Sequence, residues 1–108
     1  VDIDDYFGDK HLQIINDNFG DYDWVYANHY MWNPKQGKFL EYNTNIEVKG
    51  MCGTSSISHK RSMNAYWVNN GYEHDFVFIN TLKKISNNYG RIPCTEYMVC
   101  HAPHGIDY

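Results

Sequence analysis

Aromatic side chains alternate with other residues along positions 22–32, which read YDWVYANHYMW. A period of two is typical of a β-strand, and aromatic residues favour strands. Residues 33–37 (NPKQG) have the composition of a turn, and residues 38–49 (KFLEYNTNIEVK) return with apolar and polar side chains on opposite faces. The pattern therefore predicts a β-hairpin with one wet face. The alternating aromatic residues are Tyr22, Trp24, Tyr26, Tyr30 and Trp32, and Asn28 interrupts the series.

Two helices and two further strands are expected outside this hairpin. Residues 8–20 carry an apolar stripe at helical spacing (Leu12, Ile15 and Phe19), with Asp9 as the expected cap and Gly20 at the end. The remaining elements are a strand over 62–70, one long helix over 73–90 and a last strand over 95–101. A strand followed by a short helix is the alternative for 73–90.

The order of these elements, α-β-β-β-α-β, predicts an α+β domain. Its core would be an antiparallel sheet of about four strands with two helices packed on one face. A length of 108 residues fits a single domain over 1–108, with 1–8 as an acidic lead-in and 102–108 as an irregular tail. No apolar run approaches the roughly 20 residues needed to cross a bilayer, so no membrane partner is expected.

Charge is divided unevenly along the chain, whose net charge is −4. Residues 1–33 contain seven acids and one base, whereas residues 35–91 contain eight bases and four acids. This asymmetry favours a binding module whose acidic N-terminal third docks on a basic partner protein. Clustered carboxylates compete for a site that expects phosphates, so inhibition of a nucleic-acid enzyme is one form of this hypothesis. The residues assigned to docking are Asp2, Asp4, Asp5 and Asp9.

Residues 53–61 (GTSSISHKR) suggest an alternative function, a metal-independent ribonuclease-like domain of the kind found among toxins. Small residues let backbone amides approach a phosphate, while Lys60 and Arg61 supply positive charge. His59 would move a proton near neutral pH, with His74 or His29 as its acid–base partner. His74, at a predicted helix start, would be the better proton acceptor. Such a site needs no cofactor, and none is expected.

The aromatic strand has two interpretations. Its side chains can stack exposed RNA bases, which stabilises binding by about 1–3 kcal/mol per base. They can also form the core face of the sheet under a helix, as so many aromatic residues usually do. The residues assigned to RNA binding are Tyr26, Asn28, Tyr30 and Trp32.

Cysteine and histidine residues cluster near the end of the chain, within residues 90–105 (GRIPCTEYMVCHAPHG). If the intervening residues form a strand, Cys94 and Cys100 lie roughly 20 Å apart, too far for a disulfide or a shared zinc ion. A buried strand is therefore expected, with zinc held by Cys100 and His104 as the alternative. An odd count of three cysteines favours reduced thiols and a cytoplasmic protein, with Cys52 an inert thiol rather than a nucleophile.

Overall fold

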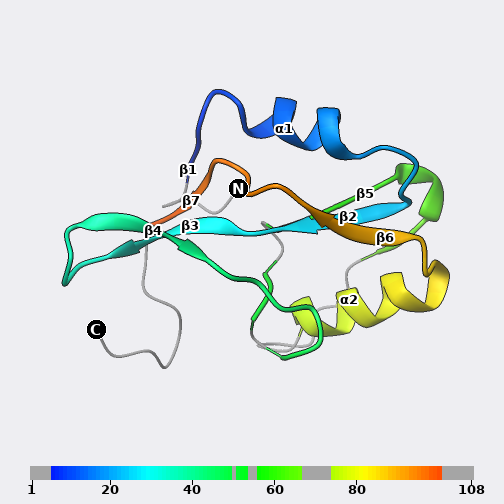
Figure 1. Ribbon diagram of the computed structural model, residues 1–108. Helices are drawn as coiled ribbons and strands as arrows, with labels where there is room; N and C mark the ends of the chain where they lie inside the picture. The colour runs from blue at the N-terminus through cyan, green and yellow to red at the C-terminus, as the bar shows by residue number, and fades with distance from the viewer. Residues whose placement is uncertain (1–5, 50, 54–55, 67–73, 101–108) are drawn as a thin grey trace.

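The described part of the structure contains two small mixed sheets and two α-helices (Figure 1). The computed structural model describes residues 6–49, 51–53, 56–66 and 74–100. Within these residues, one sheet has the strand order β1-β7-β3-β4 and the other has the order β5-β2-β6. The elements are β1 (Tyr6–Phe7), α1 (His11–Asn18), β2 (Trp24–Ala27), β3 (His29–Asn33), β4 (Lys38–Tyr42), β5 (Ile57–His59), the 3-10 turn η2 (Arg61–Met63), α2 (His74–Ile85), β6 (Tyr89–Ile92) and β7 (Tyr97–Val99).

The predicted α+β class is confirmed, but the prediction of a single antiparallel sheet is wrong. Strand β2 pairs antiparallel with β5 and parallel with β6, and β3 pairs antiparallel with β4 and parallel with β7. Parallel neighbours need a long crossover connection, and α2 lies within the crossover that leads to β6. The sequence analysis missed this crossover because it assigned all of 73–90 to one helix. In the structure the helix ends at Ile85, and Tyr89 belongs to β6.

The two helices lie on opposite faces of β2, not on one face as the sequence predicted. Successive side chains of a strand point to opposite sides, and β2 has apolar residues on both. Trp24 packs against α2, whereas Val25 and Ala27 form a separate cluster with residues of α1 and its C-terminal end. Figure 1 shows α1 above the strands and α2 below them. A strand covered on both faces has no wet side, which explains why WVYA contains no charged residue.

The larger of the two cores joins β2 to α2. Trp24 is fully buried, stacks on Tyr89 at 4.1 Å between ring centroids, and donates its indole N–H to the carbonyl oxygen of Ser86 at 3.1 Å. The smaller core joins Val25, Ala27 and Ile92 of the sheet to Ile15 and Phe19 near α1. The radius of gyration is 13.9 Å, close to the value of about 13 Å expected for one compact domain of this length.

The predictions of the hairpin and of the last strand are confirmed. The hairpin is confirmed, because β3 and β4 pair from His29↔Tyr42 to Asn33↔Lys38. Its turn ends at Gly37, whose φ of +64° is a left-handed conformation that glycine adopts freely. The returning strand is shorter than expected and stops at Tyr42 instead of residue 49. The last strand is confirmed as β7, within the predicted range of 95–101.

Two other expected segments differ from the structure. A strand was expected over 62–70, but the strand that the structure describes in this region lies earlier, at Ile57–His59; residues 62 and 63 belong to η2, and residues 67–70 lie outside the described residues. The lead-in over 1–8 includes a strand, because Tyr6 and Phe7 pair with Met98 and Tyr97 of β7. Residues 1–5 and the expected tail over 102–108 lie outside the described part of the chain.

Candidate docking surface

The outward face of α1 carries a large exposed apolar side chain. Leu12 is 65% exposed, and the exposed polar residues Gln13, Asn16 and Asp17 surround it on the helix. Positions three and four apart are neighbours on a helix with 3.6 residues per turn, so these side chains form one patch.

A second exposed apolar residue lies on β1, near the start of α1. Phe7 is 41% exposed, and its ring contacts that of His11, the residue just before Leu12, at 4.9 Å between centroids. Two large apolar side chains, Phe7 and Leu12, therefore flank the start of α1 and both reach solvent. Asp9 is exposed between them in the chain. The residues called the α1 surface below are Phe7, Asp9, Leu12, Gln13, Asn16 and Asp17.

Leu12 does not lie on the inner face of α1, where it was expected. The sequence put Leu12 on an inner stripe with Ile15 and Phe19, but only Ile15 and Phe19 pack against the sheet. His11 takes the inner position instead and is buried. Leu12 is thus left in contact with solvent on a helix that already has a packed face.

The start of α1 is fixed by a distant residue and not by the expected cap. The N-cap is Lys10, one residue after Asp9, and it makes no side-chain capping bond. Instead, the backbone N–H of Lys10 donates to Glu96 Oε2 at 3.4 Å, and the N–H of Gly8 donates to the Glu96 carbonyl oxygen at 2.7 Å. Asp9 therefore stays exposed on the surface instead of capping the helix.

The acids of the N-terminal third divide into two groups. Asp9, Asp17 and Asp21 are exposed. Asp23 lies 3.7 Å from the ammonium nitrogen of Lys60, and its side chain also accepts a hydrogen bond from Ser86 at 2.6 Å. Negative charge is thus available around the α1 surface but is compensated at Asp23. The predicted docking residues Asp2, Asp4 and Asp5 lie outside the described residues.

Two residues of the predicted phosphate site already interact with other parts of the protein. Lys60 is paired with Asp23, as above, and Arg61 is exposed on η2. His59 is half-buried: its Nδ1 lies 3.1 Å from the Lys60 carbonyl oxygen, and its ring packs edge-on against Phe78 of α2 at 5.5 Å. His74 is the first residue of α2, one turn before Phe78.

The alternating aromatic residues, some of which were assigned to RNA binding, are divided at Asn28, which lies between β2 and β3. On the β2 side Trp24 is buried, and Tyr26 lies under the guanidinium of Arg91, 4.8 Å from Cζ to the ring centroid. On the β3 side Trp32 packs edge-on against Phe39 at 5.2 Å, and Tyr30 is half-buried. These rings pack against the protein and do not form one continuous stacking surface.

Asn28 and Arg91 form the centre of a polar network at this division. Asn28 Oδ1 accepts hydrogen bonds from Arg91 Nη1 and from the backbone N–H of Thr44, and Asn28 Nδ2 donates to Glu41 at 2.7 Å. Arg91 Nη2 donates to the Thr44 carbonyl oxygen at 2.7 Å. The donors of Arg91 are therefore used to join β6 to the ends of β2 and β4, which favours a structural role for this network. The interrupted alternation pointed to Asn28, but no local pattern pointed to Arg91.

In the described part of the chain, Cys52, Cys94 and Cys100 form no disulfide with one another. Burial raises the pKa of Cys52 to about 12, so its nucleophilic thiolate is scarce at neutral pH. Within the described residues, no group of three or more His, Cys, Asp or Glu side chains could hold a metal ion. His104, of the alternative zinc site, lies outside those residues.

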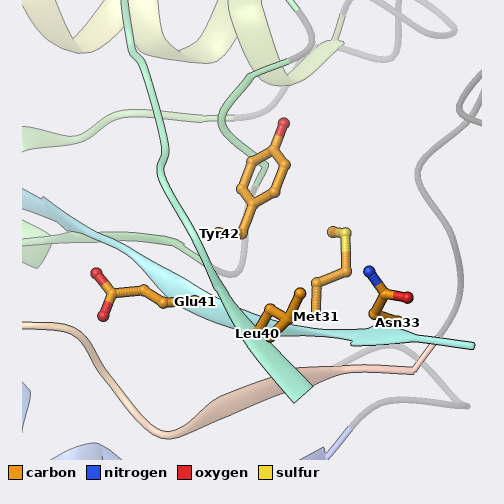
Figure 2. A pocket seen from close by; sticks show the side chains of 5 residues that line it. All are labelled: Met31, Asn33, Leu40, Glu41 and Tyr42. Carbon is orange, nitrogen blue, oxygen red and sulfur yellow. The ribbon is translucent and has the colours of Figure 1, made fainter. Parts of the chain in front are cut away.

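A small hollow lies on the β3–β4 hairpin (Figure 2). Its volume of about 190 Å³ is below the roughly 300 Å³ at which small-molecule sites begin. Figure 2 shows Met31 and Tyr42 on the same side of the hairpin, whereas Glu41 points away from Met31. The hollow is open and has few convergent polar groups, so it is a weak candidate for a ligand site. Its lining residues are Met31, Asn33, Leu40, Glu41 and Tyr42.

Comparison with known proteins gives this chain no family: no family model, no curated protein and no solved structure matches it. Neither helix within the described ranges has the length and apolar composition of a transmembrane span. The geometry thus defines an α+β domain with an exposed acidic and apolar helix face, and the choice between functions depends on that geometry.

Proposed function

We propose that the protein is a small binding module whose α1 surface docks on a basic region of a partner protein. The observation that carries this proposal is the exposure of Leu12 and Phe7 beside the exposed acids Asp9 and Asp17. Fully burying a leucine or phenylalanine side chain stabilises a structure by about 1.5–3 kcal/mol relative to leaving it exposed. The fold leaves most of this free energy unused at Leu12 and part of it at Phe7, and a partner that covers both would gain it.

The charge around α1 favours a basic partner. Asp9, Asp17 and Asp21 are exposed, and Lys10 is the single base among residues 1–33. An apolar centre with a charged rim is the usual arrangement of a protein interface, in which the rim steers association and selects the partner. Enzymes that act on nucleic acids have cationic grooves that fit such a surface. Inhibition of one of them is therefore the form of docking that we favour.

Removing the rim charges is expected to weaken the complex. The partner would be captured from extracts of cells that make the protein, purified, and titrated by calorimetry at low salt and at about 0.15 M salt. Asp9→Asn with Asp17→Asn is expected to lower affinity by about tenfold at low salt, mostly through slower association. The control is Gln36→Lys with Asn43→Lys, two exposed positions away from α1 that change the net charge by the same amount.

At about 0.15 M salt the control pair is expected to bind within about twofold of wild type, because charges then act mainly within a Debye length of about 8 Å. Equal losses in both double variants would mean that only net charge matters. Affinity that does not change with salt in the wild type would also contradict a basic partner.

RNA cleavage is a second candidate function. The contact between His59 and Phe78 favours it, because Phe78 is one turn along α2 from His74. Removing a general acid or base lowers a rate by about 100-fold or more, so His59→Ala should lose most of the cleavage of an RNA oligonucleotide in the presence of a metal chelator. Lys60→Ala should also lose activity, whereas Lys84→Ala, which removes an exposed cation of α2, should not. Absence of cleavage by the wild type, or full activity of His59→Ala, would remove this candidate.

A further inference from the structure

His11 is a buried histidine at the start of α1. It is 6% exposed, and its ring lies between Phe7 of β1 at 4.9 Å and Tyr97 of β7 at 5.7 Å, measured between ring centroids. Its Nδ1 atom is buried without a hydrogen-bond partner in the described part of the chain. In the neutral ring this nitrogen takes part in no hydrogen bond with the described residues. In the protonated ring it would carry an N–H on a buried cation, without an acceptor among those residues.

The groups that face His11 do little to offset this charge. From the segment between β6 and β7, Glu96 favours the protonated ring, but burial outweighs it and lowers the pKa of His11 below its ordinary value of 6.5. Phe7 and Tyr97 present rings, and beyond Tyr97 lies the ring of His29, 6.5 Å from Tyr97. On its own segment His11 follows the exposed residues 9 and 10, an acid and a base, and the N-terminal end of a helix further disfavours a cation.

We propose that His11 is a proton-sensitive latch, which holds α1 and β1 on the sheet at neutral pH and releases them in mildly acidic solution. The inference rests on the proposed function, because release of α1 would dismantle the α1 surface and free the partner. Docking would then depend on the acidity of the compartment.

The attachment of this region is weak enough to open locally. Within the described residues, strand β1 pairs with β7 at two positions, Tyr6↔Met98 and Phe7↔Tyr97. Beyond this pairing, the Glu96 hydrogen bonds and the packing of Ile15 and Phe19 hold α1. Short edge pairings and few apolar contacts are features of segments that open without global unfolding.

The direction of the pH effect follows from proton linkage. In the open form the His11 ring is hydrated and regains its ordinary pKa of 6.5, whereas in the closed form its pKa is lower. Between the two values the open form binds more protons, so closure is fully favoured above 6.5 and weakens as the pH falls. Uptake of one proton raises the opening equilibrium by up to about tenfold per pH unit in this range.

Hydrogen exchange of the α1 amides tests the latch without any partner. After correction for intrinsic exchange, the opening equilibrium of residues 12–18 in the wild type should be constant above about pH 7 and rise below about pH 6.5. In His11→Phe, which retains a ring between Phe7 and Tyr97 but cannot titrate, it should not depend on pH. In Glu96→Gln, which keeps an acceptor for the Lys10 N–H, it should go on rising to a lower pH, because the closed form loses the charge that favours protonation.

A pH-independent wild type, or a His11→Phe variant that keeps the wild-type dependence, would overturn the latch. If His11→Phe does not fold, NMR titration of the His11 ring in the wild type decides: a pKa below 6.5 in the closed form supports the latch, and one at or above 6.5 overturns it. These results are distinguishable from failure of docking. Absence of any partner would remove the proposed function and leave the exchange data unchanged.

Discussion

Replacing both Leu12 and Asn16 by lysine is expected to weaken partner binding by about 100-fold. A central apolar anchor of an interface contributes about 2 kcal/mol or more when removed, and tenfold in affinity corresponds to about 1.4 kcal/mol, so loss of Leu12 alone should cost about 30-fold. The two lysines, one helical turn apart, would in addition place positive charge against a basic partner, which adds repulsion. The measurement is calorimetric titration of the purified partner with the wild type and with Leu12→Lys/Asn16→Lys.

The same variant should keep its fold. Both side chains are exposed, and lysine is a good helix former, so the free energy of unfolding should change by no more than about 0.5 kcal/mol. The matched control is Val48→Lys with Asn43→Lys, which changes one exposed aliphatic residue and one exposed asparagine in the loop after β4. This control should bind as the wild type does. Full affinity in Leu12→Lys/Asn16→Lys, with the fold intact, would rule out the α1 surface as the docking site.

Trp24→Ala is expected to have the largest effect on stability, a loss of about 3–5 kcal/mol in the free energy of unfolding. Trp24 is fully buried between β2 and α2, and its removal leaves a cavity beside Tyr89 and Leu82. The carbonyl oxygen of Ser86 also loses its donor. Domains of this size are stable by roughly 5–15 kcal/mol, so this single substitution should remove a large fraction of the total stability.

Urea unfolding followed by circular dichroism measures this loss. Tyr66→Ala is the matched control, because Tyr66 is another large aromatic residue but is 75% exposed. Its removal should change the free energy of unfolding by no more than about 0.5 kcal/mol. Similar stabilities for Trp24→Ala and Tyr66→Ala would mean that α2 does not pack on β2 as described.

The parts of the fold that depend on neighbouring residues could be predicted from the sequence. The β3–β4 hairpin follows from alternation on both sides of NPKQG, and α1 follows from apolar spacing within residues 8–20. The parallel pairing of β2 with β6 could not be predicted. Tyr89 continues the helical stripe of Phe78 and Leu82, and only its pairing and stacking with Trp24 place it in a strand.

The negative charge of the α1 surface could be predicted from the sequence, but the exposure of its apolar residue Leu12 could not. The excess of acids in the first third is a property of the sequence alone, whereas the exposure of Leu12 depends on how α1 is rotated on the sheet. That rotation is set by His11, Ile15 and Phe19 packing inward, and no helical pattern distinguishes His11 from Leu12 as the buried neighbour.

For the predicted phosphate site, too, the sequence showed the residue types but not their contacts. Its cations and histidines are visible in the sequence, but the ion pair between Lys60 and Asp23 is not. Asp23 lies just before β2 and Lys60 just after β5, and these ends meet only because the two strands pair antiparallel, with Trp24 opposite His59. A contact of this kind depends on the topology of the sheet, which the local pattern did not predict.

Amide chemical-shift mapping tests docking through α1 most directly. The labelled protein would be titrated with the captured partner, and shifts followed over the whole chain. We predict that the largest shifts fall on residues 7–18, which include the α1 surface, with smaller ones on the neighbouring strand β7. Shifts centred on the β3–β4 hairpin or on η2, with α1 unchanged, would contradict the proposed function.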